Sequence, residues 1–588
     1  MTLIAELRRR KVFKVGAAYL VVAWLLIQVV STVAPQLSLP EWAPRLITFV
    51  LLLGFPVALV LAWIFDNTPD GVRVDAAPVG NKRMYAIAAA LAALAVGWYW
   101  KGRPERVDTG AEARTIAVLP FVNMSGDPDN EYFSDGISEE ILNVLASTPE
   151  LRVAARTSSF AFKGQAKEIP DIARELEVRM VLEGSVRRQG DRVRITAQLI
   201  DAQKGFHLWS QTYDRDLKDI FAIQDDIARA IGDELKVRIG GAMAQGASTA
   251  ATGSVEAYDL YLRGLAQWQL RREQSLWDAA ALFERSLAAD PDYAPAHAGL
   301  ALVFTVLDSY SARITTRESQ LRARDHAEQA LALDPASPEA FAALGNGAGK
   351  QGRRDTARRL YQRAIMLRPS FATAHQWQGT NLMVGGELEA GLASVQRAVE
   401  LDPRSMVIGH NHGWALLALG REAEARGACE RVLAFAPDYD GCLDILAFIA
   451  LLRGELDVAE PLLQRYAAAM DLGKEPLVKE LLEAFAGRGD RDVLARRLAA
   501  SGWQASFERD SGVLLYAAET PAVLVALDRG ELALDFLERL DGETGDEFAW
   551  AMVLPALDPI RCDPRFVALV ERRKIRDPHW QRVCAEKS

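Results

Sequence analysis

The chain has 588 residues, with 68 Lys and Arg against 78 Asp and Glu, so its formal net charge is −10. This length exceeds the roughly 100 to 200 residues of one domain and predicts several units. A weak negative charge offers no basic face to neutralise phosphates, which argues against nucleic acid as a partner. The four cysteines include no CxxC pair, so their spacing does not support a zinc or thioredoxin-like site.

Three apolar runs stand near the N-terminus, at 15–33, 46–65 and 84–100. Each approaches the ~20 residues that cross a ~30 Å hydrocarbon core, and we predict three transmembrane helices after a basic segment, 1–14. The Lys and Arg residues before the first run place the N-terminus in the cytoplasm of a bacterial cell. An odd number of spans then carries the C-terminal domains into the periplasm, anchored to the inner membrane. A cleaved signal peptide is the rival interpretation of the first run.

A small α/β domain is expected at 114–239, after a polar linker at 101–113. Thr115 to Phe121 (TIAVLPF) has the composition of a buried strand. Arg192 to Ile200 alternates apolar and polar residues, as a half-solvated antiparallel strand requires. Further strands are expected at 151–154 and 206–213, and helices at 137–145, 170–176 and 219–237.

The strings IAVLPFVNMSGDPDNEYFSDGISEEI and VLEGSVRRQGDRVRITAQLIDAQKGFHLWSQTYDRDLKDIFAIQDDIA resemble the TolB-amino-terminal-like domain of bacterial membrane proteins that also carry tetratricopeptide (TPR) repeats. The N-terminal stretch ELRRRKVFKVGAAYLVVAWLLIQV resembles the anchor of the same architecture. Some of these relatives carry a cyclase domain or a DNA-binding winged helix. Because only fourteen residues precede the first apolar run, we expect neither domain here.

Helical repeats are predicted beyond a small-residue linker at 240–254. Pro335, Pro369, Pro403 and Pro437 recur every thirty-four residues, which is the TPR period. The TPR solenoid is assigned to 255–473, and degenerate helical repeats with a C-terminal cap to 474–588. The repeat ending at Pro369 has aromatic, large and small residues where the TPR pattern needs them, in the order Phe341, Leu344, Gly345, Ala348, Ala357, Tyr361 and Ala364. The fold class is therefore multidomain, with three transmembrane helices, an α/β domain and an all-α solenoid.

A binding groove is expected on the first helix of each repeat, because in TPR arrays these helices line the concave face. Counting from the prolines assigns Asn346, Gln376, Thr380, His410, Trp414 and Phe448 to that groove. They are amides, a hydroxyl and aromatics without a basic cluster, which favours an internal peptide segment or a helix as the ligand over a terminal carboxylate. Trp414 is the expected anchor, and its packing inside its own repeat is the alternative.

No residue pattern predicts catalysis, a metal or a cofactor. Asp127, Asp129 and Glu131 begin like a calcium loop, but Tyr132 and Ser138 replace the Gly and Glu that the loop requires, so an acidic helix start is the simpler interpretation. His410 and His412 are two residues apart, which on a helix turns them to different faces. Cys429 is expected in a repeat core. A disulfide is predicted between Cys562 and Cys584, on either side of a terminal helix.

These observations predict a non-enzymatic, membrane-anchored scaffold or sensor whose solenoid binds a peptide or protein partner. The alternative is a ligand-sensing transmembrane signalling subunit, in which the α/β domain binds a small molecule. The two hypotheses differ in where the ligand lies, in the solenoid groove or in the α/β domain.

Overall fold

The structure is a computed structural model, and the chain forms two compact units, Met1–Thr109 and Gly110–Ser588. The residues it describes are 12–33, 51, 54–55, 65–68, 71–74, 114–148, 151–234, 252–311, 313–470, 473–502, 511–516, 518–543, 549–576 and 583–584.

Among its described residues, the first unit contains the helix α2 (Val12–Val33) and a strand pair. Strands β1 (Phe65–Thr68) and β2 (Gly71–Val74) pair in antiparallel fashion. Phe65, the last residue of the predicted second span, therefore belongs to a strand. Most of that span and all of the third, 84–100, lie outside the described residues.

Of the three predicted transmembrane helices, only the first lies within a described helix, α2. In the described part of the chain, no helix combines the length and the hydropathy needed to cross a membrane. The first run, 15–33, does form the continuous helix α2, but helix length alone is insufficient, because a span also requires sustained apolar character along the helix. The fold class with three spans is therefore wrong. The predicted inner-membrane localisation with periplasmic domains depended on those spans and is wrong for the same reason.

The second unit begins with a mixed sheet in the strand order β5-β3-β6-β7-β8, and β4 also pairs with β6. Strand β3 lies parallel to β5 and β6, and β6, β7 and β8 form an antiparallel meander. The strands are β3 (Thr115–Val118), β4 (Val122–Asn123), β5 (Arg152–Val153), β6 (Met180–Gln189), β7 (Arg192–Asp201) and β8 (Phe206–Asp216). The alternation predicted for β7 is confirmed, since Val193, Ile195, Ala197 and Leu199 are buried while Arg192 and Arg194 are exposed.

Helices cover this sheet on both faces. On one face, α5 (Glu131–Ala146) packs on β3 and α8 (Ile220–Glu234) packs on β7 and β8, around a core that includes Ile116 and Val118. On the other face, α6 (Arg156–Phe160) and α7 (Ile169–Glu175) lie over Ala117 and Leu119. The core beneath α5 and α8 continues without interruption into the first helical repeats, so the sheet region and the repeats share one apolar interior.

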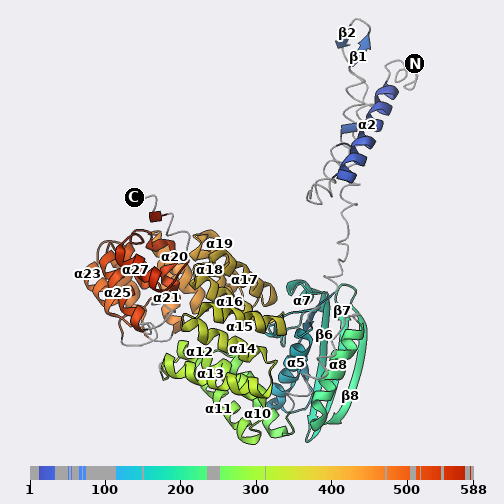
Figure 1. Ribbon diagram of the computed structural model, residues 1–588. Coiled ribbons are helices and arrows are strands. Elements are labelled where there is room, and N and C mark those ends of the chain that lie inside the picture. Colours follow the sequence, from blue (N-terminus) through green and yellow to red (C-terminus); the bar gives the residue numbers. More distant parts are fainter. Residues whose placement is uncertain are drawn as a thin grey trace. The chain divides into compact units, whose positions relative to one another are not determined.

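The repeats are antiparallel helix pairs stacked side by side (Figure 1). The helices are α10 (Val255–Gln269), α11 (Glu273–Ala289), α12 (Ala294–Val306), α13 (Thr316–Leu333), α14 (Pro338–Lys350), α15 (Arg354–Leu367), α16 (Ala372–Val384), α17 (Leu388–Leu401), α18 (Met406–Ala418), α19 (Glu422–Leu433), α20 (Asp440–Leu452) and α21 (Leu456–Met470). From α14 onward each pair repeats after thirty-four residues, which is the TPR period. The pairs continue past α21 as α22 (Glu475–Phe485), α23 (Arg491–Ala500), α24 (Thr520–Ala526), α25 (Gly530–Glu543), α26 (Ala549–Met552) and α27 (Pro564–Arg572).

Small residues let the paired helices approach closely. A Cβ atom on Gly345 would come within 2.8 Å of the Tyr361 ring, and one on Gly413 within 2.9 Å of the Cys429 sulfur. Cys429 is fully buried, as predicted for a repeat core. The turn between the two helices of a pair also recurs with the period. Gly352, Gly386, Gly420 and Gly454 all have positive φ there, which an L side chain rarely adopts.

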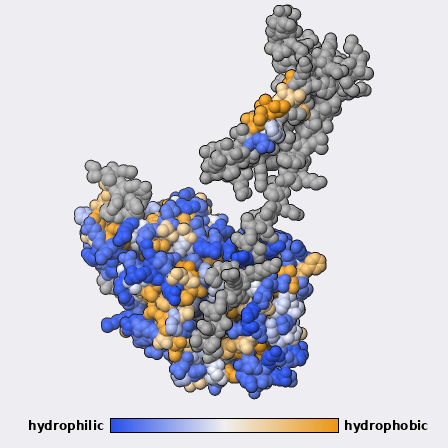
Figure 2. All heavy atoms as spheres, turned by 45° about the vertical axis from the view of Figure 1, so that its right-hand side comes forward, coloured by the Kyte–Doolittle hydropathy of each residue, from blue (hydrophilic) through white to orange (hydrophobic). Residues whose placement is uncertain are grey.

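The α/β region is tied to the repeats at two separate places. Near the first repeat, Arg188 of β6 forms an ion pair of 2.7 Å with Asp259 of α10. Near the fourth pair, the Ala155 amide donates to the Leu401 carbonyl at 2.9 Å, and Arg404 lies 3.5 Å from Glu175. The α/β region thus bridges the concave side of the solenoid. The face of this unit in Figure 2 is mostly hydrophilic, interrupted by smaller hydrophobic areas.

Candidate functional site

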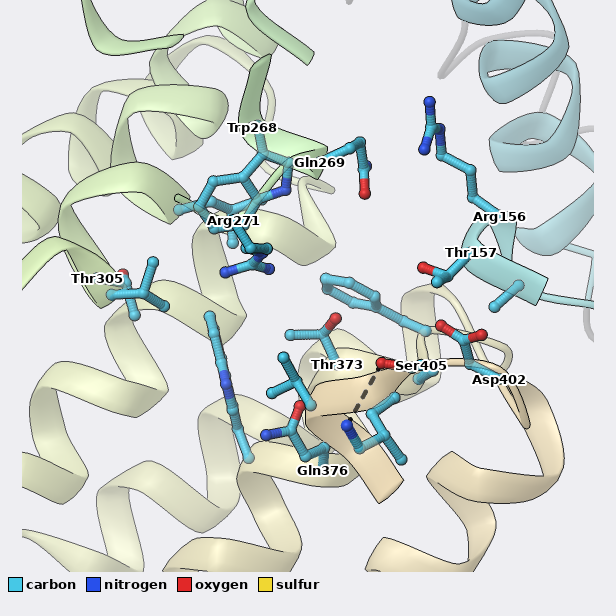
Figure 3. Close-up of a pocket in the computed structure, with 18 of the residues that line it drawn as sticks. Arg156, Thr157, Trp268, Gln269, Arg271, Thr305, Thr373, Gln376, Asp402 and Ser405 are labelled. Carbon is cyan, nitrogen blue, oxygen red and sulfur yellow. Dashed lines mark hydrogen bonds between the residues drawn. The ribbon is translucent and has the colours of Figure 1, made fainter. Parts of the chain in front are cut away.

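A cavity of about 1730 Å³ lies between the concave side of the solenoid and the α/β region. The solenoid contributes the first helices of successive repeats, α12, α14, α16, α18 and α20, together with the turn between α10 and α11. The opposite wall is α5 and the start of α6. In the close-up, Arg271, Thr373 and Gln376 from the repeats face Arg156 and Thr157 from the α/β region (Figure 3).

The structure places five of the six predicted groove residues around this cavity: Asn346, Gln376, Thr380, His410 and Trp414. The amide of Gln376 points into the open space (Figure 3). Because these side chains come from three adjacent repeats, they form one continuous surface. Whether they bind a ligand stays a prediction.

The sixth residue, Phe448, does not line the cavity. It is 1% exposed and lies behind Trp414, with the two ring centroids 6.1 Å apart. Trp414 itself is 7% exposed. It therefore lines the cavity with a small part of its surface, while its ring packs against Phe448 of the next repeat.

The α/β wall is acidic and partly neutralised. Glu139 of α5 forms an ion pair of 2.7 Å with Arg156 of α6 and accepts a hydrogen bond of 3.2 Å from Gln269. Burial, followed by the charge of Glu139, raises the pKa of the neighbouring Glu140 to about 7. At neutral pH this wall can therefore gain or lose a proton at Glu140.

Asp402 lies at the seam, the place where the solenoid wall of the cavity meets the α/β wall. The Ser158 hydroxyl of α6 donates to Asp402 Oδ1 at 2.6 Å, and the Arg404 amide in turn donates to the Ser158 oxygen at 3.0 Å. Burial raises the pKa of Asp402 to about 6, against the lowering effect of these donors. Asp402 and Ser158 are 244 residues apart, so no local pattern in the sequence signals this pair.

Aromatic side chains that the repeat count did not assign to the groove also line the cavity. Five of them are Trp268, Trp377, Tyr310, Tyr439 and Phe371. Tyr439 packs edge-on against His410, with ring centroids 6.3 Å apart. Trp377 is the residue after Gln376, a predicted groove position. A prediction that allowed the helix to rotate by one residue would therefore have included Trp377. The other four lie on turns or helix ends, where the repeat pattern gives no groove position.

His410 and His412 point to different sides of α18, as their spacing predicts. His410 lines the cavity, and burial lowers its pKa to about 4, so it is neutral at pH 7. His412 lies outside the cavity lining, and burial lowers its pKa as well. Across the residues that the structure describes, no three His, Cys, Asp or Glu side chains are grouped to hold a metal ion.

The acidic segment Asp127–Glu131 forms a helix start. The Asp127 carboxylate accepts a hydrogen bond of 3.0 Å from the Asp129 amide and caps a short 3-10 helix, η2 (Pro128–Asn130), directly before α5. Elsewhere, the structure joins Cys562 and Cys584 by a disulfide, with Cα atoms 5.4 Å apart. The oxidation state of these two thiols in the purified protein stays a prediction, which a mass measurement after alkylation can test.

Known proteins resemble separate parts of this chain. A family model described as HilA/YgeH-like transcriptional regulator, second domain, matches residues 112–230, so it covers the α/β region. A protein of Rhizobium meliloti named "Putative adenylate cyclase 3" is 41% identical over 225 residues, which are 38% of each chain. Transcriptional regulator HilA of Salmonella paratyphi A is 24% identical over 161 residues, 27% of this chain and 29% of HilA.

Both matches leave more than half of each relative uncovered, so the relatives' activities do not transfer by similarity alone. Among solved structures, the tetratricopeptide-repeat protein TTC0263 of Thermus thermophilus is 20% identical and has a TM-score of 0.27. That similarity covers 31% of this chain and 92% of the other. The TPR architecture rests on the helix pairs and their period rather than on this likeness.

Proposed function

We propose that this chain is a non-enzymatic binding protein that holds an internal segment of a peptide or protein partner in the cavity between its solenoid and its α/β region. The observation that carries the proposal is the cavity itself, about 1730 Å³ and lined by amides and aromatic rings of successive repeats. Small-molecule pockets usually enclose about 300 to 1000 Å³, so this space suits a larger ligand.

The lining supports a peptide ligand chemically. Asn346, Gln376 and Thr380 can donate to and accept from a peptide backbone. Asn346 lies on α14, and the other two lie on α16, the first helix of the next repeat. Small exposed parts of the Trp377 and Trp414 rings add apolar surface to the lining. Polar groups that fix the register and aromatic groups that supply affinity are the usual composition of a peptide-binding surface.

The test is selection from a pool of random peptides with both termini capped, using the immobilised full chain. We expect the wild type to retain a restricted set of peptides. The double variant Gln376→Ala/Thr380→Ala is expected to bind them about tenfold or more weakly, because it removes two cavity-facing polar groups.

Gln378→Ala is the matched control. Gln378 lies on the same helix, but its side chain accepts a hydrogen bond of 3.3 Å from Ser394 within the repeat and does not line the cavity. It should bind the selected peptides like the wild type. Retention of no peptide, or equal retention by the double variant at an unchanged melting temperature, would contradict the proposal.

A small-molecule sensor is the second candidate, favoured by one observation. The α/β region supplies Glu139, Glu140 and Arg156 to the same cavity, so a ligand there would contact both parts of the chain. A metabolite panel that raises the melting temperature of the wild type, with no peptide retained in the selection, would favour this candidate.

A further inference from the structure

Arg271 occupies an unusual place in the cavity. It lies in the short turn between α10 and α11, with a positive φ of 50°, a conformation that few non-glycine residues adopt. Its guanidinium stacks on the Trp268 ring at 3.6 Å from the centroid. The exposed part of the side chain faces the cavity, where its nitrogens point toward Thr373 and Gln376 (Figure 3).

The other enclosed cations of the lining are each neutralised by a carboxylate. Arg156 pairs with Glu139 at 2.7 Å, Lys350 with Asp308 at 2.7 Å, and Arg368 with Glu339 at 2.5 Å. The adjacent Arg272 is exposed. For Arg271, none of the described carboxylates lies within ion-pairing distance.

The groups that do influence Arg271 are neutral phenols, Tyr310 and Tyr439. Burial raises the pKa of both, so they stay protonated and supply no counter-charge. Burial also lowers the pKa of Arg271. Enclosing a cation without an anion is costly, whereas a charge-assisted bond to an incoming carboxylate recovers that cost.

We propose that Arg271 is the anchor for one carboxylate of the bound peptide, so the partner segment is acidic at a single position. This inference rests on the proposed function. A carboxylate is favoured over a phosphate because the remaining lining is rich in acids, among them Glu140, Asp402 and Asp440, which would repel a dianion.

The experiment uses the peptides retained by the full chain, each synthesised in an acidic form and in the amide form, Asp→Asn or Glu→Gln. We expect the wild type to prefer the acidic form by about tenfold or more, as a hydrogen bond to a charged group provides. Arg271→Met should reduce that preference to less than about twofold, and Arg271→Lys should keep part of it.

Arg313→Met is the matched control. Arg313 also stacks on a tryptophan, Trp277, at 4.7 Å, but it is exposed and lies outside the cavity lining. It should leave the preference unchanged. The melting temperature of Arg271→Met should not fall below that of the wild type, because the substitution removes an uncompensated enclosed charge; a clear fall would indicate a structural role and overturn the proposal.

The remaining outcomes separate the anchor from the proposed function. Peptide binding without an acidic preference, or a preference that Arg271→Met leaves intact, overturns the anchor alone. If no peptide is retained, the proposed function fails, and a titration with N-acetyl-aspartate amide, followed by tryptophan fluorescence, tests the anchor separately. If the wild type binds N-acetyl-aspartate amide and Arg271→Met does not, the anchor is supported. If the wild type does not bind this compound, or binds inorganic phosphate more strongly, the anchor is overturned.

Discussion

The two walls of the cavity are built in different ways. On the solenoid wall, Asn346, Thr380 and Trp414 occupy equivalent positions, each thirty-four residues after the last. On the α/β wall, Glu139, Glu140 and Arg156 follow no period. The solenoid wall combines amides and aromatic rings with charged side chains such as Arg271 and Asp402, and the α/β wall adds its own two carboxylates and one guanidinium. A repeat array thus supplies a regular surface, while the domain that closes it adds charged side chains at positions that the repeat does not set.

The largest expected effect comes from breaking the solenoid wall. A Cβ atom at Gly379 of α16 would lie 2.6 Å from a Val395 methyl group and 2.8 Å from the Gly391 carbonyl oxygen, which cannot rotate away. Gly379→Val should therefore destabilise the repeats by about 4 kcal/mol. Thermal unfolding followed by circular dichroism measures this loss.

Gly347→Val is the control for that change. Gly347 lies in the equivalent kind of helix, α14, but no neighbouring atom stands within 4 Å of the place that an added Cβ would take, so the effect should stay within about 1 kcal/mol. Equal melting temperatures for the two variants would show that close helix approach does not hold this wall together.

A second prediction concerns the seam between the walls. The pKa of Asp402 is raised from 3.8 to about 6, so the folded chain keeps a proton that the unfolded chain releases. Its contribution to stability is present at pH 4 and is lost as the pH rises to about 6. The size is roughly 3 kcal/mol at most, from ~1.4 kcal/mol per pKa unit.

Asp402→Asn removes this titration while its amide oxygen can still accept the Ser158 hydrogen bond. Between pH 4 and pH 6, the wild type should lose stability relative to the variant, and above that window the difference should be constant. Denaturation curves measured across this range would contradict the prediction if the two proteins changed in parallel.

The smallest expected effect concerns the other tie between the α/β region and the solenoid. Arg188 and Asp259 are 19% and 17% exposed and form a 2.7 Å ion pair. Arg188→Gln should lower the stability by roughly 1 kcal/mol. Arg192→Gln, which breaks an exposed pair with Asp214, should change it by less than about 0.5 kcal/mol. Similar melting temperatures for both variants would mean that the tie at Asp259 is dispensable.

The sequence by itself determined the local elements and the repeat period. The alternation in Arg192–Asp201 reflects the two-residue side-chain period of a strand. The recurring prolines reflect the length of one helix pair. Each pattern depends only on residues that are near one another in the sequence. The same counting located five residues of the cavity wall. It failed for the N-terminal runs, because a run of apolar residues, even one that forms the helix α2, does not by itself establish a helix that crosses a membrane.

Only the tertiary structure decided what faces the solenoid. The small rotation from one repeat to the next accumulates into the curvature of the array, and that curvature brings Leu401 and Asp402 against α6. No local pattern encodes a contact across 244 residues. The role of Arg271 was also decided by the tertiary structure, because nothing in the sequence distinguishes this arginine from the others. Only the structure shows that Glu139, Asp308 and Glu339 pair with other cations of the lining, which leaves Arg271 without a described carboxylate partner.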